Sequence, residues 1–181
     1  ALIDTIRPGG SLLLFADDPG TLGLQHRLPA PDAKILTFGF SAGAEVRGEH
    51  VKLVREESKD SWPIGMTATI VSGDESVPVE IAGAVGSHAF LPALAAAAVA
   101  NALNKPLGDL VGAIESYDPP AGRMRLVRGI KETLIIDDTY NASPAATIAA
   151  LETLALIAPK GRKIAAIGDM LEKGLLTGRA H

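Results

Sequence analysis

Two adjacent carboxylates at the end of an apolar run are the residues of this chain best suited to chemistry. Residues 134–144 read LIIDDTYNASP, and the β-branched run predicts a strand that ends at Asp137 and Asp138. Ser143 and Pro144 then fit the N-cap and the first position of a helix. Open α/β sheets bind ligands at the carboxyl ends of their strands. The pair therefore predicts a partner such as a ribose, an ammonium, an arginine or a metal, unless the loop is simply acidic and solvated.

A second apolar run ends in an acid in the same way. Residues 163–170 read KIAAIGDM, and a segment of helical spacing separates them from the first run. The two runs predict parallel strands at about 133–137 and 163–167, joined by a right-handed crossover helix. Asp169 would then lie at the same sheet edge as Asp138, and two acidic strand ends on one edge form a better candidate site than either alone.

Composition and charge exclude several classes of function. The 181 residues carry a net charge of −4 and are 47% hydrophobic, so we expect a globular chain without a nucleic-acid partner. The longest apolar stretch, residues 89–103, is too short and too rich in alanine to insert in a membrane. Cysteine is absent, which excludes disulfides and thiolate zinc sites. No secretory signal pattern begins the sequence, which favours a cytoplasmic location.

The remaining pattern alternates short apolar strands with helices, which predicts an α/β fold. Residues 117–122 read YDPPAG, and the two prolines favour a linker between domains over residues 1–119 and 120–181. The predicted strands span residues 8–15, 34–40, 44–55, 66–72 and 77–84, and the predicted helices span residues 89–103, 106–116 and 145–158.

Several motifs, in order along the chain, resemble those of the Mur ligases, which are ATP-dependent ligases of peptidoglycan synthesis. LIIDDTYNASPAATIAALETL followed by KIAAIGDMLEKG is similar to the start of their C-terminal domain, which typically reads DDSYNANP and then GDMxELG. Upstream, FADDPGTLGL, GSHAFLPALAAAAVA and PPAGRMRL are similar to the family's NADDP element, helix start and linker. The matching residues of the C-terminal motifs are Asp137, Asp138, Tyr140, Asn141, Ala142, Pro144, Gly168, Asp169, Met170, Glu172 and Gly174, and His181 corresponds to a later family histidine.

The resemblance implies a place for this chain within a longer enzyme. Residues 1–119 would form the end of the central ATP-binding domain. Residues 120–181 would form the first part of a Rossmann-like C-terminal domain with parallel strands. No GxxxxGK[ST] phosphate loop occurs in the sequence. The magnesium ligands and the modified lysine of the family are expected upstream of Ala1, so we expect a piece of a longer protein.

Within the family, DDTYNASP and GDMLE are most like the motifs of the MurF type. That likeness implies a ligase that adds D-alanyl-D-alanine to UDP-MurNAc-tripeptide through an acyl phosphate. ATP and Mg²⁺ are the implied cofactors, the two substrates are the implied partners, and a cytoplasmic monomer is the implied state. The alternatives are a non-catalytic nucleotide- or peptide-binding remnant, an assembly partner of the cell-wall pathway, and an unrelated flavodoxin-like binding domain.

The resemblance also implies three residues that act on the nucleotide. Arg123, just past the linker, would reach the ATP phosphates and is the candidate catalytic residue, since a guanidinium stays charged and binds two oxygens at once. Asp138 would accept the ribose hydroxyls, and His88 would lie near the nucleotide. Taken without the resemblance, Arg123 is more simply a surface arginine beside Arg125, and His88 a cap or packing residue at a helix start.

Three further residues are implied on the substrate side. Tyr140 and Asn141 would line the cleft between the domains, and Asp169 would lie at the end of the second strand. Asn141 fits equally well as a turn residue that bonds its own backbone, and Asp169 as a turn cap. No metal ligand is expected within this chain.

The sequence departs from the family at three positions that are asparagine in typical members. Phe15 replaces the Asn before the ADDP element, Ala89 replaces the Asn after the histidine, and Pro92 replaces an Asn that typically contacts adenine. None of the three side chains forms a hydrogen bond, and proline also lacks an N–H. We therefore expect a weaker or different recognition of ATP.

Because the sequence contains no phosphate loop, we predict that the isolated chain catalyses no ATP-dependent ligation of D-alanyl-D-alanine. The measurement is release of inorganic phosphate with ATP, UDP-MurNAc-tripeptide and D-alanyl-D-alanine. Release above background that requires both substrates would contradict the prediction.

Overall fold

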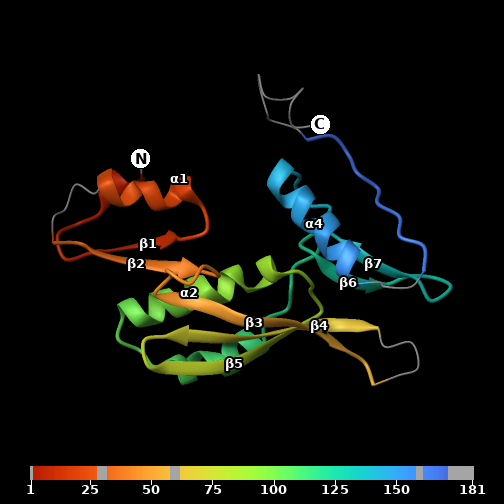
Figure 1. Cartoon of the computed structure of the whole chain (residues 1–181), viewed down its shortest axis with the longest axis horizontal. Coiled ribbons are helices and arrows are strands. Elements are labelled where there is room, and N and C mark those ends of the chain that lie inside the picture. The colour runs from red at the N-terminus through yellow and green to blue at the C-terminus, as the bar shows by residue number, and fades with distance from the viewer. Residues whose placement is uncertain (1, 28–31, 58–61, 158–160, 171–181) are drawn as a thin grey trace. The chain divides into compact units, whose positions relative to one another are not determined.

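The computed structural model describes residues 2–27, 32–57, 62–157 and 161–170, and it confirms the α/β class (Figure 1). The chain forms two compact units, each assembled from segments that are separate in the sequence. The first unit contains Ala1–Lys52, Thr67–Glu80 and Phe90–Ser116, and the second contains Leu53–Met66, Ile81–Ala89 and Tyr117–His181. In the described residues, no helix is long and apolar enough to cross a membrane.

Five strands form the larger sheet, in the order β1-β2-β3-β4-β5. Strands β1 and β2 pair in parallel from Ser11↔Lys34 to Phe15↔Phe38, and β2 pairs with β3 in parallel at Phe38↔Val46. All five strands were predicted from the sequence, with ends that differ by a few residues. Their bounds are β1 Ser11–Phe15, β2 Lys34–Gly39, β3 Val46–Arg55, β4 Pro63–Ser72 and β5 Glu75–Ala82.

The alternation of apolar residues explains which strand faces are buried. In β4, Met66, Ala68 and Ile70 are buried at every second position, as the period of a strand requires. In β5, Val79 and Ile81 repeat the pattern. The sheet therefore has a continuous apolar face that needs a cover.

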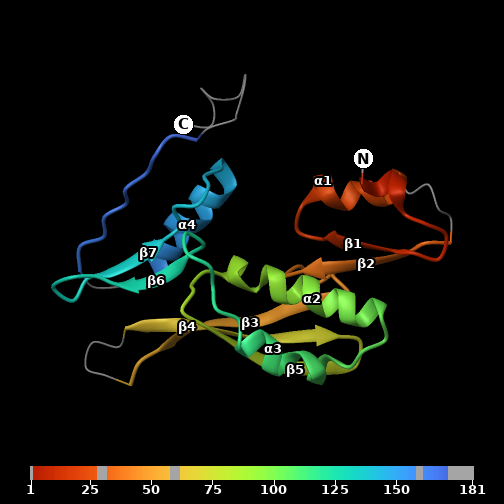
Figure 2. The ribbon, with the colours of Figure 1, turned by 180° about the vertical axis from the view of Figure 1, so that it is seen from behind.

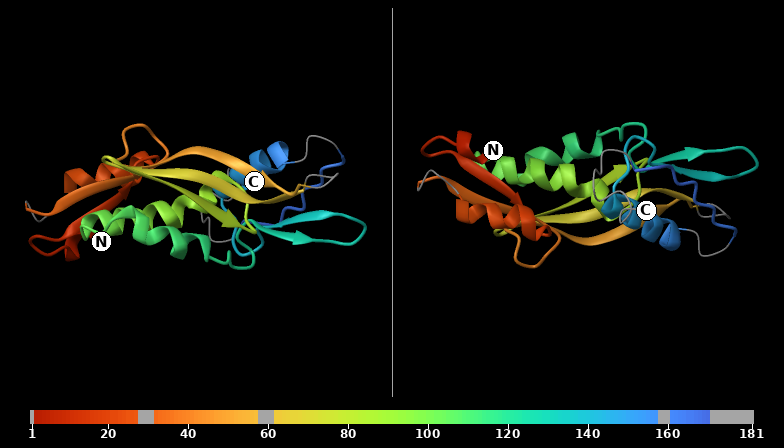
Figure 3. Two further views of the ribbon diagram at one scale, coloured as in Figure 1. Left: turned by 90° about the horizontal axis from the view of Figure 1, so that it is seen from below. Right: turned by 90° about the horizontal axis from the view of Figure 1, so that it is seen from above.

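An alanine-rich helix covers part of that face. Helix α2 (Leu91–Ala102) packs against β1 and β2, and Leu94 is fully buried (Figures 1 and 3). The helix approaches closely because Gly48 leaves room: a Cβ there would lie 2.8 Å from Phe40 Cε1 and 3.3 Å from Leu94 Cδ1. Small side chains thus set the distance between helix and sheet.

The predicted helix over residues 106–116 is divided into two short pieces. A 3₁₀ helix, Leu107–Leu110, leads into α3 (Val111–Glu115), which lies beside β5 (Figure 2). The Leu107 N–H donates to the carboxylate of Glu75 on β5 over 2.7 Å. This bond satisfies one of the orphan amides at the helix start and fastens it to the sheet.

The second unit contains a hairpin and a helix. Strands β6 (Arg125–Arg128) and β7 (Leu134–Asp137) pair antiparallel, and α4 (Pro144–Ile157) follows. The Ser143 hydroxyl accepts from the Ala146 N–H at 3.2 Å, so the predicted cap and the helix start at Pro144 are confirmed. Strand β6 was not predicted, because its four residues contain two arginines.

The predicted pair of parallel strands at 133–137 and 163–167 is not formed. The neighbour of β7 is β6, and residues 161–170 belong to no helix or strand. Ile164 and Ile167 are 68% and 60% exposed. A parallel strand buries both faces, and the described residues supply no cover for this one. A hairpin partner only a few residues away in the chain also costs less loop entropy than a crossover.

We predict that Leu94→Ala destabilises the chain by about 2–5 kcal/mol, because it leaves a cavity between α2 and the sheet. Leu103→Ala, at an exposed position directly after the same helix, is the control and should cost much less. Urea unfolding followed by circular dichroism measures both. Equal losses for the two variants would show that α2 is not packed as described.

Candidate functional site

Backbone amides of the loop at residues 122–124 form hydrogen bonds with the residues at and just after the end of β7. The Gly122 N–H donates to Asp137 Oδ2 over 3.0 Å, and the Met124 N–H donates to Asp138 Oδ1 over 3.2 Å. In return, the Tyr140 N–H donates to the Gly122 carbonyl over 3.2 Å. The partners of the two carboxylates in this chain are therefore amide groups of a neighbouring loop, a possibility that the sequence alone did not suggest.

The loop needs these bonds because its backbone is strained. Gly122 has φ +74°, and a Cβ there would lie 2.8 Å from the Tyr140 nitrogen, so only glycine fits. Met124 has φ +53°, which costs a residue with a side chain about 1–2 kcal/mol. Its side chain is buried, and its carbonyl accepts from the Val85 N–H at 3.2 Å. Burial and these hydrogen bonds offset the strain.

Arg123 lies between the two anchored amides, and its side chain is exposed. Its Cζ atom is 4.3 Å from the centre of the Tyr140 ring, a cation–π contact. Among the described residues, its guanidinium forms no ion pair. Two residues singled out from the sequence are thus brought together, and the charge of Arg123 stays available to an anion.

His88 is a third predicted site residue, and the negative charge of Asp138 acts on its ring. It lies in the 3₁₀ helix Ser87–Phe90, and its ring packs on Gly86, where a Cβ would be 2.5 Å from His88 Cε1. Burial lowers the pKa of His88 below its ordinary value, and the negative charge of Asp138 acts against that shift. The folded chain therefore favours the neutral imidazole near neutral pH.

Asp137 accepts more hydrogen bonds from the described residues than Asp138 does. Besides the Gly122 amide, it accepts from the Thr139 hydroxyl at 2.7 Å and from the Thr139 N–H at 3.3 Å. The Thr139 hydroxyl first, and then the Gly122 amide, lower the pKa of Asp137, because they stabilise its charged form. The sequence indicated the acid pair but gave no sign that the loop at residue 122 is its partner.

Asn141 and Asp169, the other two predicted site residues, belong neither to the loop at residues 122–124 nor to β7. The Asn141 side-chain oxygen accepts from the Ala142 N–H at 2.9 Å, as expected for a turn residue. Asp169 lies in the irregular segment 161–170, so its position at a strand end is not formed. Of the family departures, Phe15 packs its ring against Phe38 at 5.8 Å between centres, and Pro92 occupies the first turn of α2.

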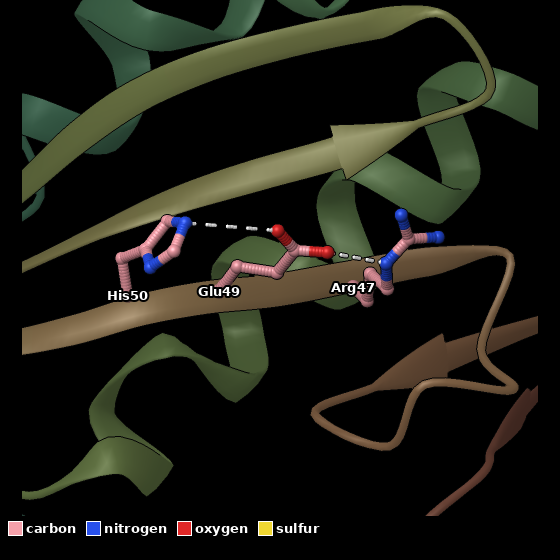
Figure 4. A network of polar contacts seen from close by, with 3 residues as sticks. All are labelled: Arg47, Glu49 and His50. Atoms are coloured by element: carbon pink, nitrogen blue, oxygen red, sulfur yellow. Dashed lines mark hydrogen bonds and ion pairs between the residues drawn. The ribbon is translucent and has the colours of Figure 1, made fainter.

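A second cluster of polar side chains, on β3, is a weaker candidate for a functional site. Arg47 Nε lies 2.5 Å from one oxygen of Glu49, and His50 Nε2 lies 3.9 Å from the other (Figure 4). These side chains are at least a third exposed, and such surface ion pairs contribute little energy. In the part of the chain that the structure describes, no group of three or more histidines and acids is placed to hold a metal ion.

Comparison with known proteins relates the chain to one family. The family model "Mur ligase, glutamate ligase domain" matches residues 122–181. A UDP-N-acetylmuramate–L-alanine ligase of Mycobacterium marinum is 30% identical over 155 residues, which is 85% of this chain and 31% of that ligase. A UDP-N-acetylmuramoyl-tripeptide–D-alanyl-D-alanine ligase of Buchnera aphidicola is 39% identical over 90 residues, which is 50% of this chain and 19% of that ligase.

Solved structures agree with the sequence comparison. MurF from Acinetobacter baumannii superposes with a TM-score of 0.80 at 26% identity, covering 99% of this chain and 36% of that one. MurF from Thermotoga maritima in complex with ADP superposes with a TM-score of 0.73 at 25% identity, covering 96% of this chain and 36% of that one. The predicted resemblance to the Mur ligases is confirmed, and the chain spans about a third of the length of the L-alanine ligase and of either MurF.

The electrostatic interaction between His88 and Asp138 predicts how the pKa of the histidine responds when the acid is removed. Removing the charge in Asp138→Asn should lower the His88 pKa further, because the carboxylate favours the protonated ring. NMR titration of the imidazole protons measures the shift, and Asp118→Asn, which neutralises an exposed acid near the same loop, is the control. A rise in the Asp138→Asn variant would contradict this electrostatic coupling.

The lowered His88 pKa also predicts how stability depends on pH. The unfolded chain binds the proton more readily than the folded chain, so the contribution of His88 is present above its unfolded pKa of about 6.5. It is lost as the pH falls below that value, through the lower folded pKa. Urea unfolding at pH 7.5 and pH 5 should therefore show a smaller loss of stability for His88→Gln than for the unaltered chain, whereas equal losses would exclude a role for this group.

Proposed function

Because its relatives in sequence and in fold are Mur ligases, we propose that this chain is part of an ATP-dependent ligase of peptidoglycan precursor synthesis. In this reaction a substrate carboxylate attacks the γ-phosphorus of ATP, ADP leaves, and an acyl phosphate forms. The amine of the incoming amino acid or peptide then attacks the carbonyl carbon. Inorganic phosphate leaves, the amine gives up a proton, and an amide remains.

The observation that carries the proposal is the presentation of Arg123. Its backbone lies between two amides that are bound to carboxylates. Its side chain rests on Tyr140, and it forms no ion pair with the residues that the structure describes. Phosphoryl transfer depends mainly on positioning and on neutralising the charge of the transferred group. An exposed guanidinium with a fixed base is suited to that task, since it can bind two phosphate oxygens at once.

Asp138 and His88 are suited to bind the nucleoside part of ATP. Asp138 uses Oδ1 for the Met124 amide, and Oδ2 accepts no hydrogen bond within the described part of the chain. A carboxylate oxygen can accept a ribose hydroxyl, as acids do in dinucleotide sites. The neutral His88 ring adds a donor or acceptor beside it. ADP in the related Thermotoga maritima MurF supports the choice of ATP as cofactor.

Mg²⁺ would neutralise the phosphate charge during transfer. Among the described residues, acids and histidines do not gather as a metal site, so we assign no ligand of this ion to them. Tyr140, Asn141 and Asp169 stay the proposed residues of the substrate side, and a cytoplasmic monomer stays the proposed state. The domains are proposed to divide at residues 119–120.

The incoming amine is proposed to be that of D-alanyl-D-alanine. The motif DDTYNASP and the two MurF structures support this choice, whereas the Mycobacterium marinum relative is named for L-alanine. Comparing L-alanine and D-alanyl-D-alanine as amine substrates of the full-length enzyme decides between them. The UDP-MurNAc acceptor must be varied as well, because each amine requires its own acceptor.

A non-catalytic nucleotide-binding remnant is the second candidate. Phe15, Ala89 and Pro92 favour it, since none offers the side-chain hydrogen bond of the asparagine that it replaces. Calorimetric titration of the full-length protein with ATP, alongside the ligation assay, separates the two functions. Binding without ligation of any amine would support the remnant.

We predict that Arg123→Ala in the full-length enzyme lowers kcat about a hundredfold, or about 3 kcal/mol, because it removes charge stabilisation in the transition state. Asp138→Asn should chiefly raise the KM for ATP, since an amide fills the same space but accepts fewer hydrogen bonds. Ligation rates at several ATP concentrations measure both. Arg27→Ala, an exposed arginine in the first unit, is the matched control. If Arg123→Ala and Asp138→Asn leave kcat and KM unchanged, the proposed roles are wrong.

A further inference from the structure

The geometry around Arg123 points to a residue that acts on it from a distance. We propose that Asp137 is a positioning residue: by holding the Gly122 amide it fixes the backbone from which Arg123 places its guanidinium over Tyr140. This inference rests on the proposed function of Arg123 at the phosphates, and it adds a role that neither the sequence motifs nor the family likeness assigned to Asp137.

The first step of the argument is that Asp137 is fully engaged within the chain. Oδ2 accepts from the Gly122 N–H at 3.0 Å, and Oδ1 accepts from the Thr139 hydroxyl at 2.7 Å and from the Thr139 N–H at 3.3 Å. Both oxygens therefore point at protein donors. A carboxylate used in this way organises its neighbours rather than binding a ligand itself.

The second step is that the loop has no regular structure to hold it. Gly122 and Met124 are both in the left-handed region, with φ +74° and +53°, so residues 122–124 belong to no helix or strand. Outside an ordered helix or sheet, a backbone amide is fixed only by the acceptor that it finds. Asp137 supplies that acceptor directly before Arg123, and Asp138 supplies one directly after it.

The third step is that one short segment controls both ends of the cation–π contact. Tyr140 follows Asp137 by three positions, and its own N–H donates to the Gly122 carbonyl over 3.2 Å. The Tyr140 ring and the Arg123 guanidinium are therefore both positioned by the hydrogen bonds between residues 122–124 and residues 137–140. If the Asp137–Gly122 bond is lost, the backbone before Arg123 loses its carboxylate anchor, and only the Met124–Asp138 bond and the Tyr140–Gly122 bond still hold the loop.

The geometry also separates a positioning role from a charge role. In Asp137→Asn the amide oxygen can still accept from the Gly122 N–H, and the Thr139 hydroxyl can rotate to accept from the new NH₂ group. Only the longer bond from the Thr139 N–H is lost, because two donors then face each other. In Asp137→Ala no acceptor remains. A residue needed for its position is rescued by asparagine, whereas a residue needed for its charge fails equally in both variants.

The first experiment is performed on the 181-residue chain and needs no activity. The Tyr140 ring should shift the Arg123 side-chain protons upfield, and Tyr140→Leu identifies that shift by removing it. We expect Asp137→Ala to lose most of the shift and Asp137→Asn to keep most of it. Asp118→Ala, which removes an exposed acid that lies 3.5 Å from Arg125, should leave it unchanged. An unchanged shift in Asp137→Ala, or equal losses in Ala and Asn, overturns the proposal.

A second variant covers the case in which Asp137→Ala does not fold. Thr139→Val replaces the hydroxyl donor by a methyl group at an exposed position and leaves the Asp137 carboxylate in place. We expect a partial loss of the upfield shift, in the same direction as Asp137→Ala. No loss in a folded Thr139→Val chain would count against the proposal.

Kinetics of the full-length enzyme supply the link to function. Asp137→Ala should lower kcat about tenfold, because a displaced cation loses transition-state stabilisation. Combined with Arg123→Ala it should add less than about twofold, since it acts only through that arginine. Additive losses overturn the positioning role alone, whereas an Arg123→Ala enzyme of normal rate overturns the proposed function and leaves the NMR result standing.

Discussion

Backbone amides that no helix or strand satisfies are the constraint on which the second unit depends. The amides of Gly122 and Met124 lie in a loop with left-handed residues, and each donates to one carboxylate of the Asp137–Asp138 pair. An unsatisfied buried amide costs about 1–3 kcal/mol, so these bonds decide whether the loop has one conformation. They also decide where Arg123 and Tyr140 lie, because Arg123 stands between the two amides and the Tyr140 N–H donates to the Gly122 carbonyl.

The first unit uses an acid pair in a comparable way. Asp17 accepts from the amides of Phe40 and Ser41 over 2.6 and 2.8 Å, which ties the end of β1 to the end of β2. Asp18 caps the short helix α1 (Pro19–Leu22) by accepting from the Thr21 amide at 2.7 Å. Thus both DD pairs of the chain fasten backbone that leaves a strand. In each pair both oxygens of the first acid accept hydrogen bonds from the chain.

Residues at the end of β3 and the start of β4 extend this organisation within the second unit. The Arg55 guanidinium donates to the Ile157 carbonyl at the end of α4 over 2.8 Å, where a cation also suits the helix dipole. Arg128 on β6 pairs with Glu56 and lies 5.8 Å from the centre of the Trp62 ring. The unit is therefore held by charged side chains that bond backbone or rings, with a small apolar core.

Local patterns in the sequence were sufficient to predict most helices and strands, because each of these elements depends on residues that are neighbours in the chain. Short apolar segments between Gly, Pro and charged turns predicted β4 and β5, the alanine run predicted α2, and Ser143 with Pro144 predicted the start of α4. Strand β6 was missed because two of its four residues are arginines, so its apolar run is too short to predict a strand. The strand expected at residues 163–167 was wrong because an apolar run forms a buried strand only where other elements cover it.

The sequence by itself determined the α/β class, the positions of the apolar strands and helices, and the resemblance to the Mur ligases. It also singled out His88, Arg123, Asp138 and Tyr140. Only the tertiary structure decided that Arg123 lies on the Tyr140 ring, that the charge of Asp138 acts on His88, and that amides at residues 122 and 124 are the partners of the acid pair. The physical reason is that a hydrogen bond between residues about fifteen positions apart leaves no periodic trace in the sequence, whereas packing against a sheet or along a helix does.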